Sequence, residues 1–245
     1  MKSPTLRLGA LAAAVLLAGG AAMAQEAQIR KGLAERIPSF PKIDEVRPSP
    51  IPGLFEVRYG GTEIIYTDAK GEFLLQGALI DAKTMTNLTE ERIDKLSAVD
   101  FSELPLKDAM VIKQGSGARK LAVFADPNCG YCKRFERDLQ SIKDVTIYTF
   151  IIPILGPDSN AKTRDIWCTK DAAKTWRAWM LDGALPPKSM DPKCDMAAIE
   201  RNLAFARKYR VNGTPAVFFE DGTRKPGALP AAAIEKLLVA AAKKG

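Results

Sequence analysis

The sequence predicts a two-domain chain of mixed α+β and α/β class. Residues 25–86 contain short strand-like runs separated by glycine-containing turns, which indicate a small antiparallel sheet. Residues 87–113 predict a linker helix. Residues 114–245 alternate strand and helix patterns around a helical insertion, which predicts a larger α/β domain.

The first 24 residues predict an export signal that is removed from the mature chain. Lys2 and Arg7 form a short positive region, and residues 8–18 form an apolar run too short to span a bilayer. The Ala-Met-Ala sequence at residues 22–24 is typical of a cleavage site, so we expect cleavage after Ala24. The alternative is an uncleaved membrane anchor.

Export places the mature protein where disulfides persist. Loss of residues 1–24 lowers the formal net charge from +7 to +5, because Lys2 and Arg7 are removed. This mild positive charge is spread along the chain, which is typical of a solvated surface and does not indicate nucleic-acid binding.

The chain has no histidine and four cysteines. The absence of histidine excludes Cys–His nucleophilic catalysis, His-ligated metal sites and His-based pH switching. The cysteines form two pairs, Cys129 with Cys132 and Cys168 with Cys194. A four-cysteine zinc site is the alternative, but structural zinc usually takes two close pairs, and the second pair is far apart in sequence. We expect no metal and no cofactor.

The N-terminal domain is expected to open with a short helix over residues 27–36. Prolines then interrupt regular structure; they are Pro38, Pro41, Pro48, Pro50 and Pro52. Three strands are predicted, at residues 54–59, 62–67 and 72–76. About 60 residues bury only a marginal fraction of their surface, so pairing with a second copy of the chain would stabilise this domain.

Asn87 is predicted to begin the linker helix as its N-cap, with Glu90 reaching back. Residues 87–89 also match a glycosylation sequon, which is the weaker interpretation for an exported bacterial-type chain. One apolar stripe is formed by Ile93, Leu96 and either Val99 or Phe101. We expect this helix to serve as a stiff linker as far as Pro105.

The Cys-x-x-Cys sequence of residues 129–132 lies between an apolar strand-like run and a segment of helical character. A helix start presents unpaired N–H groups and a partial positive charge, which favour a thiolate. Cys129 is therefore the predicted nucleophile with a lowered pKa, and Cys132 is the predicted resolving cysteine. Gly130 and Tyr131 lie between them, and a plain surface aromatic is the alternative to a functional role for Tyr131.

The remaining elements follow a thioredoxin-like order of strand, helix, strand, helical insertion, two strands and a closing helix. The expected strands and the closing helix are at residues 145–153, 216–219, 223–226 and 231–243, and the insertion is at 156–209. Trp167, Trp176 and Trp179 lie in the insertion, where they are expected to form core rather than a ligand site.

Thr214-Pro215 directly precedes a predicted strand. In thioredoxin-like folds the proline at this place is cis and lies beside the Cys-x-x-Cys sequence. The backbone of Thr214 would then face the sulfurs and offer hydrogen-bonding groups to an extended substrate peptide. We therefore assign Thr214 and Pro215, with Gly130 and Tyr131, to support of the active site and substrate binding.

The chain resembles the periplasmic DsbC/DsbG disulfide-isomerase family, and its Cys-Gly-Tyr-Cys core resembles the DsbC branch. The matching segments are residues 129–132, 213–216, 221–223, 52–57, 76–77 and 87–89. The resemblance implies that the N-terminal domain dimerises and that a linker helix joins it to a thioredoxin-like catalytic domain. In the implied homodimer, both active sites face an apolar cleft.

The resemblance also implies partners: misfolded exported proteins with wrong disulfides, and a membrane thiol reductase of the DsbD type that keeps the site reduced. Family members often have histidine directly after the second active-site cysteine, where this chain has Lys133. That difference affects the expected thiolate pKa and redox potential more than the mechanism.

Cys168 and Cys194 are expected to form a structural disulfide, because they lack the strand-to-helix setting of the first pair. A second redox pair or two free thiols are the alternatives. For the whole protein, three functions are weighed: a dimeric disulfide isomerase and reductase, a dithiol oxidase, and a thiol-independent chaperone. The first is favoured, and chaperone activity is compatible with it.

Overall fold

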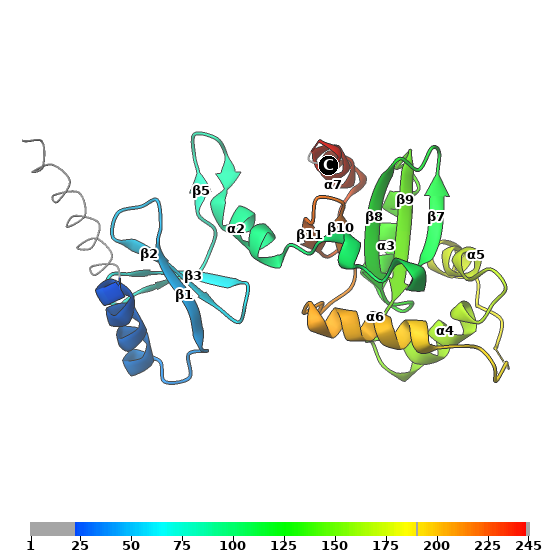
Figure 1. Cartoon of the computed structure of the whole chain (residues 1–245), viewed down its shortest axis with the longest axis horizontal. Coiled ribbons are helices and arrows are strands. Elements are labelled where there is room, and N and C mark those ends of the chain that lie inside the picture. Colours follow the sequence, from blue (N-terminus) through cyan, green and yellow to red (C-terminus); the bar gives the residue numbers. More distant parts are fainter. Residues whose placement is uncertain (1–22, 190, 244–245) are drawn as a thin grey trace, which may run out of the picture. The chain divides into compact units, whose positions relative to one another are not determined.

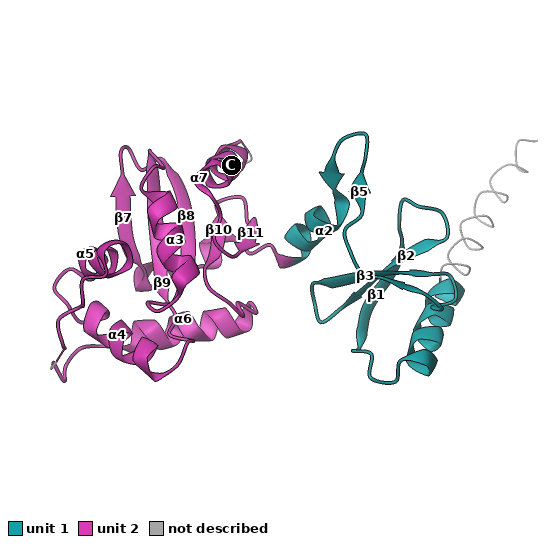
Figure 2. Cartoon of the chain, turned by 180° about the vertical axis from the view of Figure 1, so that it is seen from behind, with its two compact units in different colours: residues 1–96 teal, residues 97–245 magenta. Residues whose placement is uncertain are grey.

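The computed structural model describes residues 23–189 and 191–243. The chain divides into two compact units, Met1–Leu96 and Ser97–Gly245, which are coloured separately in Figure 2. Most of the expected export signal, including residues 1–22, lies outside the described residues. Within the described part of the chain, no helix is both long and apolar enough to cross a membrane.

The first unit packs one helix, at residues 23–36, against a small antiparallel sheet (Figure 1). Its strands follow the order β1-β2-β3-β4. Their bounds are Ile43–Pro48, Leu54–Tyr59, Glu63–Asp68 and Leu74–Leu75. Ile29, Leu33, Val57 and Ile65 form its small buried cluster. A short hairpin of β5 (Ile80–Asp81) and β6 (Thr86–Asn87) follows.

The prediction that prolines prevent regular structure before residue 53 is wrong for β1. Among the described strands it pairs with β2 alone and therefore lies at an edge of the sheet. Its last residue is Pro48. A proline is tolerated at an edge because the missing N–H need not take part in a ladder on the open side. The hairpin of β5 and β6 was also not predicted.

The linker helix is shorter than residues 87–113. Helix α2 spans Leu88–Ser97, and its start is capped as expected, because the Asn87 Oδ1 atom accepts a hydrogen bond from the Glu90 N–H (2.9 Å). Two 3₁₀ turns follow, and strand β7 (Met110–Gln114) occupies the end of the expected helix. Val99 and Phe101 lie beyond α2 and are buried in the core of the second unit.

The second unit is built on a five-stranded sheet with the order β11-β10-β8-β9-β7 (Figure 1). The central strands β8 (Arg119–Ala125) and β9 (Val145–Ile151) run parallel, and the other pairs are antiparallel. Strands β10 and β11 span Ala216–Phe219 and Arg224–Pro226. All of these strands except β7 were predicted, β10 at the same bounds and the others at slightly different ones.

Both faces of this sheet are covered by a buried cluster. Side chains of β8 alternate between the two faces, so the strand contributes to both clusters. Leu121, Val123 and Ala125 join a cluster with helices α3 (Gly130–Leu139) and α7 (Ala231–Ala242). Ala122 and Phe124 face the opposite cluster, which holds other aromatic residues: Phe101, Phe150, Phe205 and Phe218. The strand is therefore buried on both faces, which explains its continuous apolar sequence.

The described part of the insertion contains the α-helices α4 (Pro157–Trp167), α5 (Ala172–Arg177) and α6 (Ala197–Lys208). A π-helical turn, Ala178–Asp182, continues α5. Trp176 is fully buried, while Trp167 and Trp179 are partly buried against the same cluster. The expectation that the three tryptophans belong to the core is confirmed.

Candidate active site at the start of helix α3

The Cys-x-x-Cys sequence lies where β8 ends and α3 begins. The N–H of Cys129 donates to the carbonyl of Asp126 (3.1 Å), which forms the connecting turn. Cys129 is the N-cap residue of α3, and its Sγ atom accepts a hydrogen bond from the N–H of Cys132 (3.3 Å). A sulfur therefore occupies the position at which a capping oxygen usually meets the unpaired N–H groups of a helix.

The pKa of Cys129 is lowered from 9.0 to about 6. The largest cause is the hydrogen bond from the Cys132 side chain, followed among the lowering effects by the Thr214 side chain and the backbone N–H groups of Cys132 and Tyr131. Burial acts in the opposite direction. Hydrogen bonds to the charged form favour that form, so Cys129 is predominantly a thiolate at neutral pH.

Cys132 differs from Cys129 in its surroundings. It is 1% exposed, and its pKa is raised first by burial and then by its hydrogen bond with Cys129. The two sulfurs are free in this structure. One thiolate and one protonated thiol, one helical turn apart, are the two forms needed for attack on a disulfide and later resolution.

Thr214 and Pro215 lie beside Cys129. The peptide bond between them is cis, and the Cys129 Sγ atom lies 3.3 Å from the carbonyl oxygen of Thr214, to which it donates when protonated. Pro215 leads directly into β10, which pairs with β8. The structure therefore brings together the two sequence signatures, although more than 80 residues separate them.

Gly130 and Tyr131 are both exposed, and the Tyr131 side chain is 68% exposed. A Cβ atom at Gly130 would meet no heavy atom within 4 Å. Tyr131 therefore lies at the surface beside Cys129 and Cys132, and its assignment to substrate binding stays a prediction.

Trp179 reaches the site from the insertion. Its indole N–H donates to the carbonyl of Pro127 (2.6 Å), two residues before Cys129. The Lys133 ammonium lies 3.9 Å from the centroid of the Trp179 ring, which is a cation–π contact. The pKa of Lys133 is lowered, chiefly by burial. Sequence reasoning assigned Trp179 to the core and missed its contacts with Pro127 and Lys133 beside the active site.

Asp126 is a second residue that sequence reasoning missed. It is fully buried, and its carboxylate accepts four hydrogen bonds. The donors are the Asn128 N–H (2.7 Å), the Ile154 N–H (2.8 Å), the Leu155 N–H (3.0 Å) and the Ser159 hydroxyl (2.8 Å). Its position directly after an apolar strand was the available signal, because a carboxylate buried there needs several donors.

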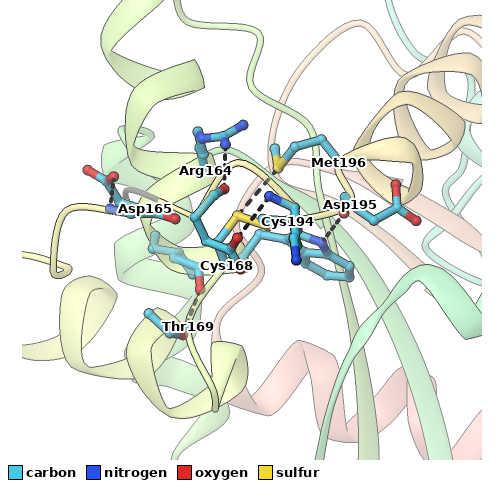
Figure 3. Close-up of a disulfide and its surroundings, with 12 residues drawn as sticks. Arg164, Asp165, Cys168, Thr169, Cys194, Asp195 and Met196 are labelled. Atoms are coloured by element: carbon cyan, nitrogen blue, oxygen red, sulfur yellow. Dashed lines mark hydrogen bonds between the residues drawn. A yellow bond between two sulfur atoms is a disulfide. The ribbon is translucent and has the colours of Figure 1, made fainter.

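Cys168 and Cys194 form a disulfide, shown in Figure 3. Cys168 ends α4, and Cys194 lies shortly before α6. A second link near the disulfide is the hydrogen bond that the Trp167 indole N–H donates to the carbonyl of Asp195 (3.0 Å). Arg164 also donates to the carbonyl of Asp191 (2.9 Å). The bond closes the loop between these two helices of the insertion.

We expect the double substitution Cys168→Ser and Cys194→Ser to lower the free energy of unfolding by about 3.5 kcal/mol, because it opens a loop of about 27 residues in the unfolded chain. Urea denaturation of the wild type and the variant measures the difference. The rate at which Cys129 reacts with a small disulfide should stay unchanged. A large loss of that rate in a folded variant would contradict a purely structural role for the Cys168–Cys194 bond.

Two family models together match most of the chain. The thioredoxin-like domain matches residues 106–242, and the disulfide bond isomerase protein N-terminal domain matches residues 20–90. The first match includes the Cys-x-x-Cys sequence and the cis-proline, and the second includes the small sheet.

Similar proteins agree with these matches. A probable thiol:disulfide interchange protein DsbC of Bordetella parapertussis is 47% identical over 210 residues, covering 86% of this chain and 73% of the relative. The thiol:disulfide interchange protein DsbC of Escherichia coli K12 is 28% identical over 227 residues, covering 89% of each chain. The crystal structure of a disulfide interchange protein from Neisseria gonorrhoeae is 32% identical, with a TM-score of 0.51, covering 56% of this chain and 98% of that one. With its two family matches and its Bordetella relative, the chain belongs to the DsbC family of thiol:disulfide interchange proteins.

Proposed function

We propose that this protein isomerises or reduces wrong disulfides in exported proteins through Cys129 and Cys132. The observation that supports this most is the setting of Cys129 at the start of α3, where the pKa of its thiol is lowered to about 6. The low pKa of Cys129 suits a nucleophile. The backbone carbonyl of Thr214 beside it suits the binding of an extended peptide.

The reaction begins when the Cys129 thiolate attacks one sulfur of a client disulfide. A bond forms between Cys129 and that sulfur, the client disulfide breaks, and the other client sulfur leaves as a thiolate. Two outcomes follow. A client thiolate can attack the mixed disulfide, forming a new client pairing and releasing Cys129. Alternatively, Cys132 loses its proton and attacks Cys129, which releases the client reduced and leaves a Cys129–Cys132 disulfide.

The second outcome consumes two electrons, so reduction of the Cys129–Cys132 disulfide is required before another cycle. We propose a membrane thiol reductase of the DsbD type as the donor. The proposed location is the periplasm, with the export signal cleaved after Ala24. Support comes from the positive and apolar composition of the leader and from an oxidised Cys168–Cys194 pair, which is typical of exported proteins.

Two other functions remain as competing proposals. A dithiol oxidase would use the same cysteines with the pair mainly oxidised in the intact cell, whereas an isomerase requires a mainly reduced pair. A thiol-independent chaperone would bind unfolded clients without either cysteine, and this activity can coexist with the first. Reactivation of a scrambled multi-disulfide protein, with Cys129→Ala as the comparison, tests the proposed function.

We propose that the first unit forms a homodimer through the open edge of its sheet. Strand β4 is the last strand of this sheet, and its Leu74 and Leu75 side chains are 44% and 52% exposed. The neighbouring Phe73 is 72% exposed. An uncovered apolar edge strand is a template for association, and a second copy would cover both its backbone groups and its side chains.

We expect the paired substitution Leu74→Glu and Leu75→Lys to convert the dimer to a monomer, because charges would then be buried at the covered edge. Sedimentation velocity measures the mass of each form. Leu185→Glu, on an exposed leucine of the second unit, is the control and should remain dimeric. A monomeric wild type, or a dimeric paired variant, would refute this interface.

A further inference from the structure

The turn that follows β9, residues 152–155, lies beside the Cys-x-x-Cys sequence. Strands β8 and β9 are parallel neighbours, with Ala125 opposite Ile151, so both end at the same edge of the sheet (Figure 1). The N–H of Ile152 donates to the carbonyl of Ala125 (2.9 Å), which continues the pairing past the end of β9.

Strand order places this turn and the cis-proline on opposite sides of the catalytic loop. The loop continues β8, which lies between β10 and β9 in the sheet. Pro215 is joined to β10 on one side, and the turn is joined to β9 on the other. The loop that carries Cys129 therefore has the Thr214 backbone on one side and the turn on the other.

Asp126 holds the turn in place. One carboxylate oxygen accepts the N–H groups of Ile154 and Leu155, while the other accepts the N–H of Asn128 and the hydroxyl of Ser159. The carboxylate is fully buried, so all four hydrogen bonds form away from solvent, where they are strongest. The turn and the loop that carries Cys129 are thus connected through a single side chain.

Although its backbone is held, the turn exposes apolar side chains. Ile154 is 40% exposed and Leu155 is 54% exposed. Asp158, the nearest acidic residue along the chain, is paired with the Lys162 ammonium and accepts the Asn128 amide (2.7 Å). The exposed surface of the turn is therefore apolar, with its neighbouring carboxylate neutralised.

We propose that Ile154 and Leu155 form a client-binding surface that selects extended segments with apolar residues next to the reacting cysteine. This proposal rests on the proposed function. Once a client cysteine is bonded to Cys129, its sequence neighbours are at most a few ångströms further along an extended chain, since each residue advances about 3.3 Å. These neighbouring client residues must therefore lie over the segments that surround Cys129, and the turn is one of those segments.

The residue composition around client cysteines also favours apolar segments at this turn. Cysteine is among the residues most often fully buried in folded proteins, so its neighbours in a misfolded client include apolar side chains that have not found their core. Contact with Ile154 and Leu155 removes apolar surface from water on both molecules. A correctly folded client withdraws those residues, which ends the contact.

The test compares two synthetic peptides, each with one cysteine linked to glutathione as a mixed disulfide. One peptide has leucine and valine beside the cysteine, and the other has serine and glycine. Reduced wild-type protein is mixed with each in single-turnover reactions, and the apparent affinity and maximal rate are separated by varying the protein concentration. Glutathione disulfide is the small substrate without a peptide.

We expect the wild type to react with the apolar peptide at roughly tenfold lower concentrations than with the polar one. The double variant Ile154→Ser and Leu155→Ser should lose most of this preference. Both substitutions keep the N–H groups that Asp126 binds. The maximal rate, the reaction with glutathione disulfide and the pKa of Cys129 should stay at wild-type values, which shows that the variant is folded and its thiol unaffected.

Leu185→Ser, which removes an exposed leucine of the same unit, is the matched control and should keep the preference. A double variant that retains the preference, or a wild type that shows none, overturns the client-binding surface. If the wild type reacts with neither peptide nor with glutathione disulfide, the result would instead count against the proposed function itself.

Discussion

Cys129→Ala is expected to abolish the reactivation of a scrambled multi-disulfide protein. The substitution removes the attacking thiolate, and Cys132 is unsuited to replace it because it is 1% exposed and its pKa is raised by burial. We expect the rate to fall to the level of the redox buffer alone, a loss of at least about a hundredfold given the difference in thiolate content between the two cysteines. Recovery of the client's enzymatic activity over time is the measurement.

The same variant separates isomerase from chaperone. Suppression of client aggregation should survive in Cys129→Ala, since binding of apolar segments requires no thiol. Cys132→Ala is the matched variant: it keeps the nucleophile and should accumulate mixed disulfides with clients, because the internal route of release is lost. Full reactivation by Cys129→Ala would sink the assignment of Cys129 as the nucleophile.

The second large effect is the pH dependence of the reduced site. With a pKa of about 6, Cys129 is about nine tenths thiolate at pH 7, whereas an ordinary cysteine with a pKa of 9.0 is about one hundredth thiolate. We expect the alkylation rate of Cys129 to reach half its maximum near pH 6. Ultraviolet absorbance of the thiolate, followed during titration of the reduced protein, measures the same transition.

The lowered pKa also links stability to pH. Between about pH 6 and pH 9 the folded reduced protein binds fewer protons at Cys129 than the unfolded chain does, so this group stabilises the fold increasingly as the pH rises through that range. The contribution is lost as the pH falls through about 6. Denaturation of the reduced protein at pH 5 and pH 8 tests the sign.

Thr214→Val is the variant that tests the cause of the lowered pKa. It keeps the shape of the side chain and removes the hydroxyl, one of the groups that lower the pKa of Cys129. Its midpoint should therefore move to higher pH. A wild-type midpoint near pH 9 would contradict the hydrogen bonding described for the thiolate.

The elements that the sequence predicted well are those whose signals are local. Strand β8 is apolar throughout because both of its faces are buried, and the change to a polar helical pattern after Cys132 marks α3. Helix α2 begins at the predicted cap, since the capping bond joins residues only three positions apart. Strand β10 and helix α7 were located for the same reason.

The elements that were missed depend on partners distant in the sequence. Strand β1 ends in a proline and lies at an open edge, where only pairing with β2 defines it. Strand β7 was read as the end of a helix, and it is a strand because it pairs with β9. Propensity is a weak guide for such edge strands, because tertiary pairing overrides it.

Sequence alone determined the chemistry of this protein: four cysteines, no histidine, a Cys-x-x-Cys at a helix start, and a Thr-Pro before a strand. These are properties of residue type and short spacing, which folding cannot change. Only the tertiary structure decided which groups surround Cys129. The Thr214 carbonyl, the Trp179 indole and the Asp126 carboxylate with its turn at Ile154 reach the site through strand order and helix packing. The energy of those contacts comes from burial, and burial exists only once the sheet and the insertion have formed.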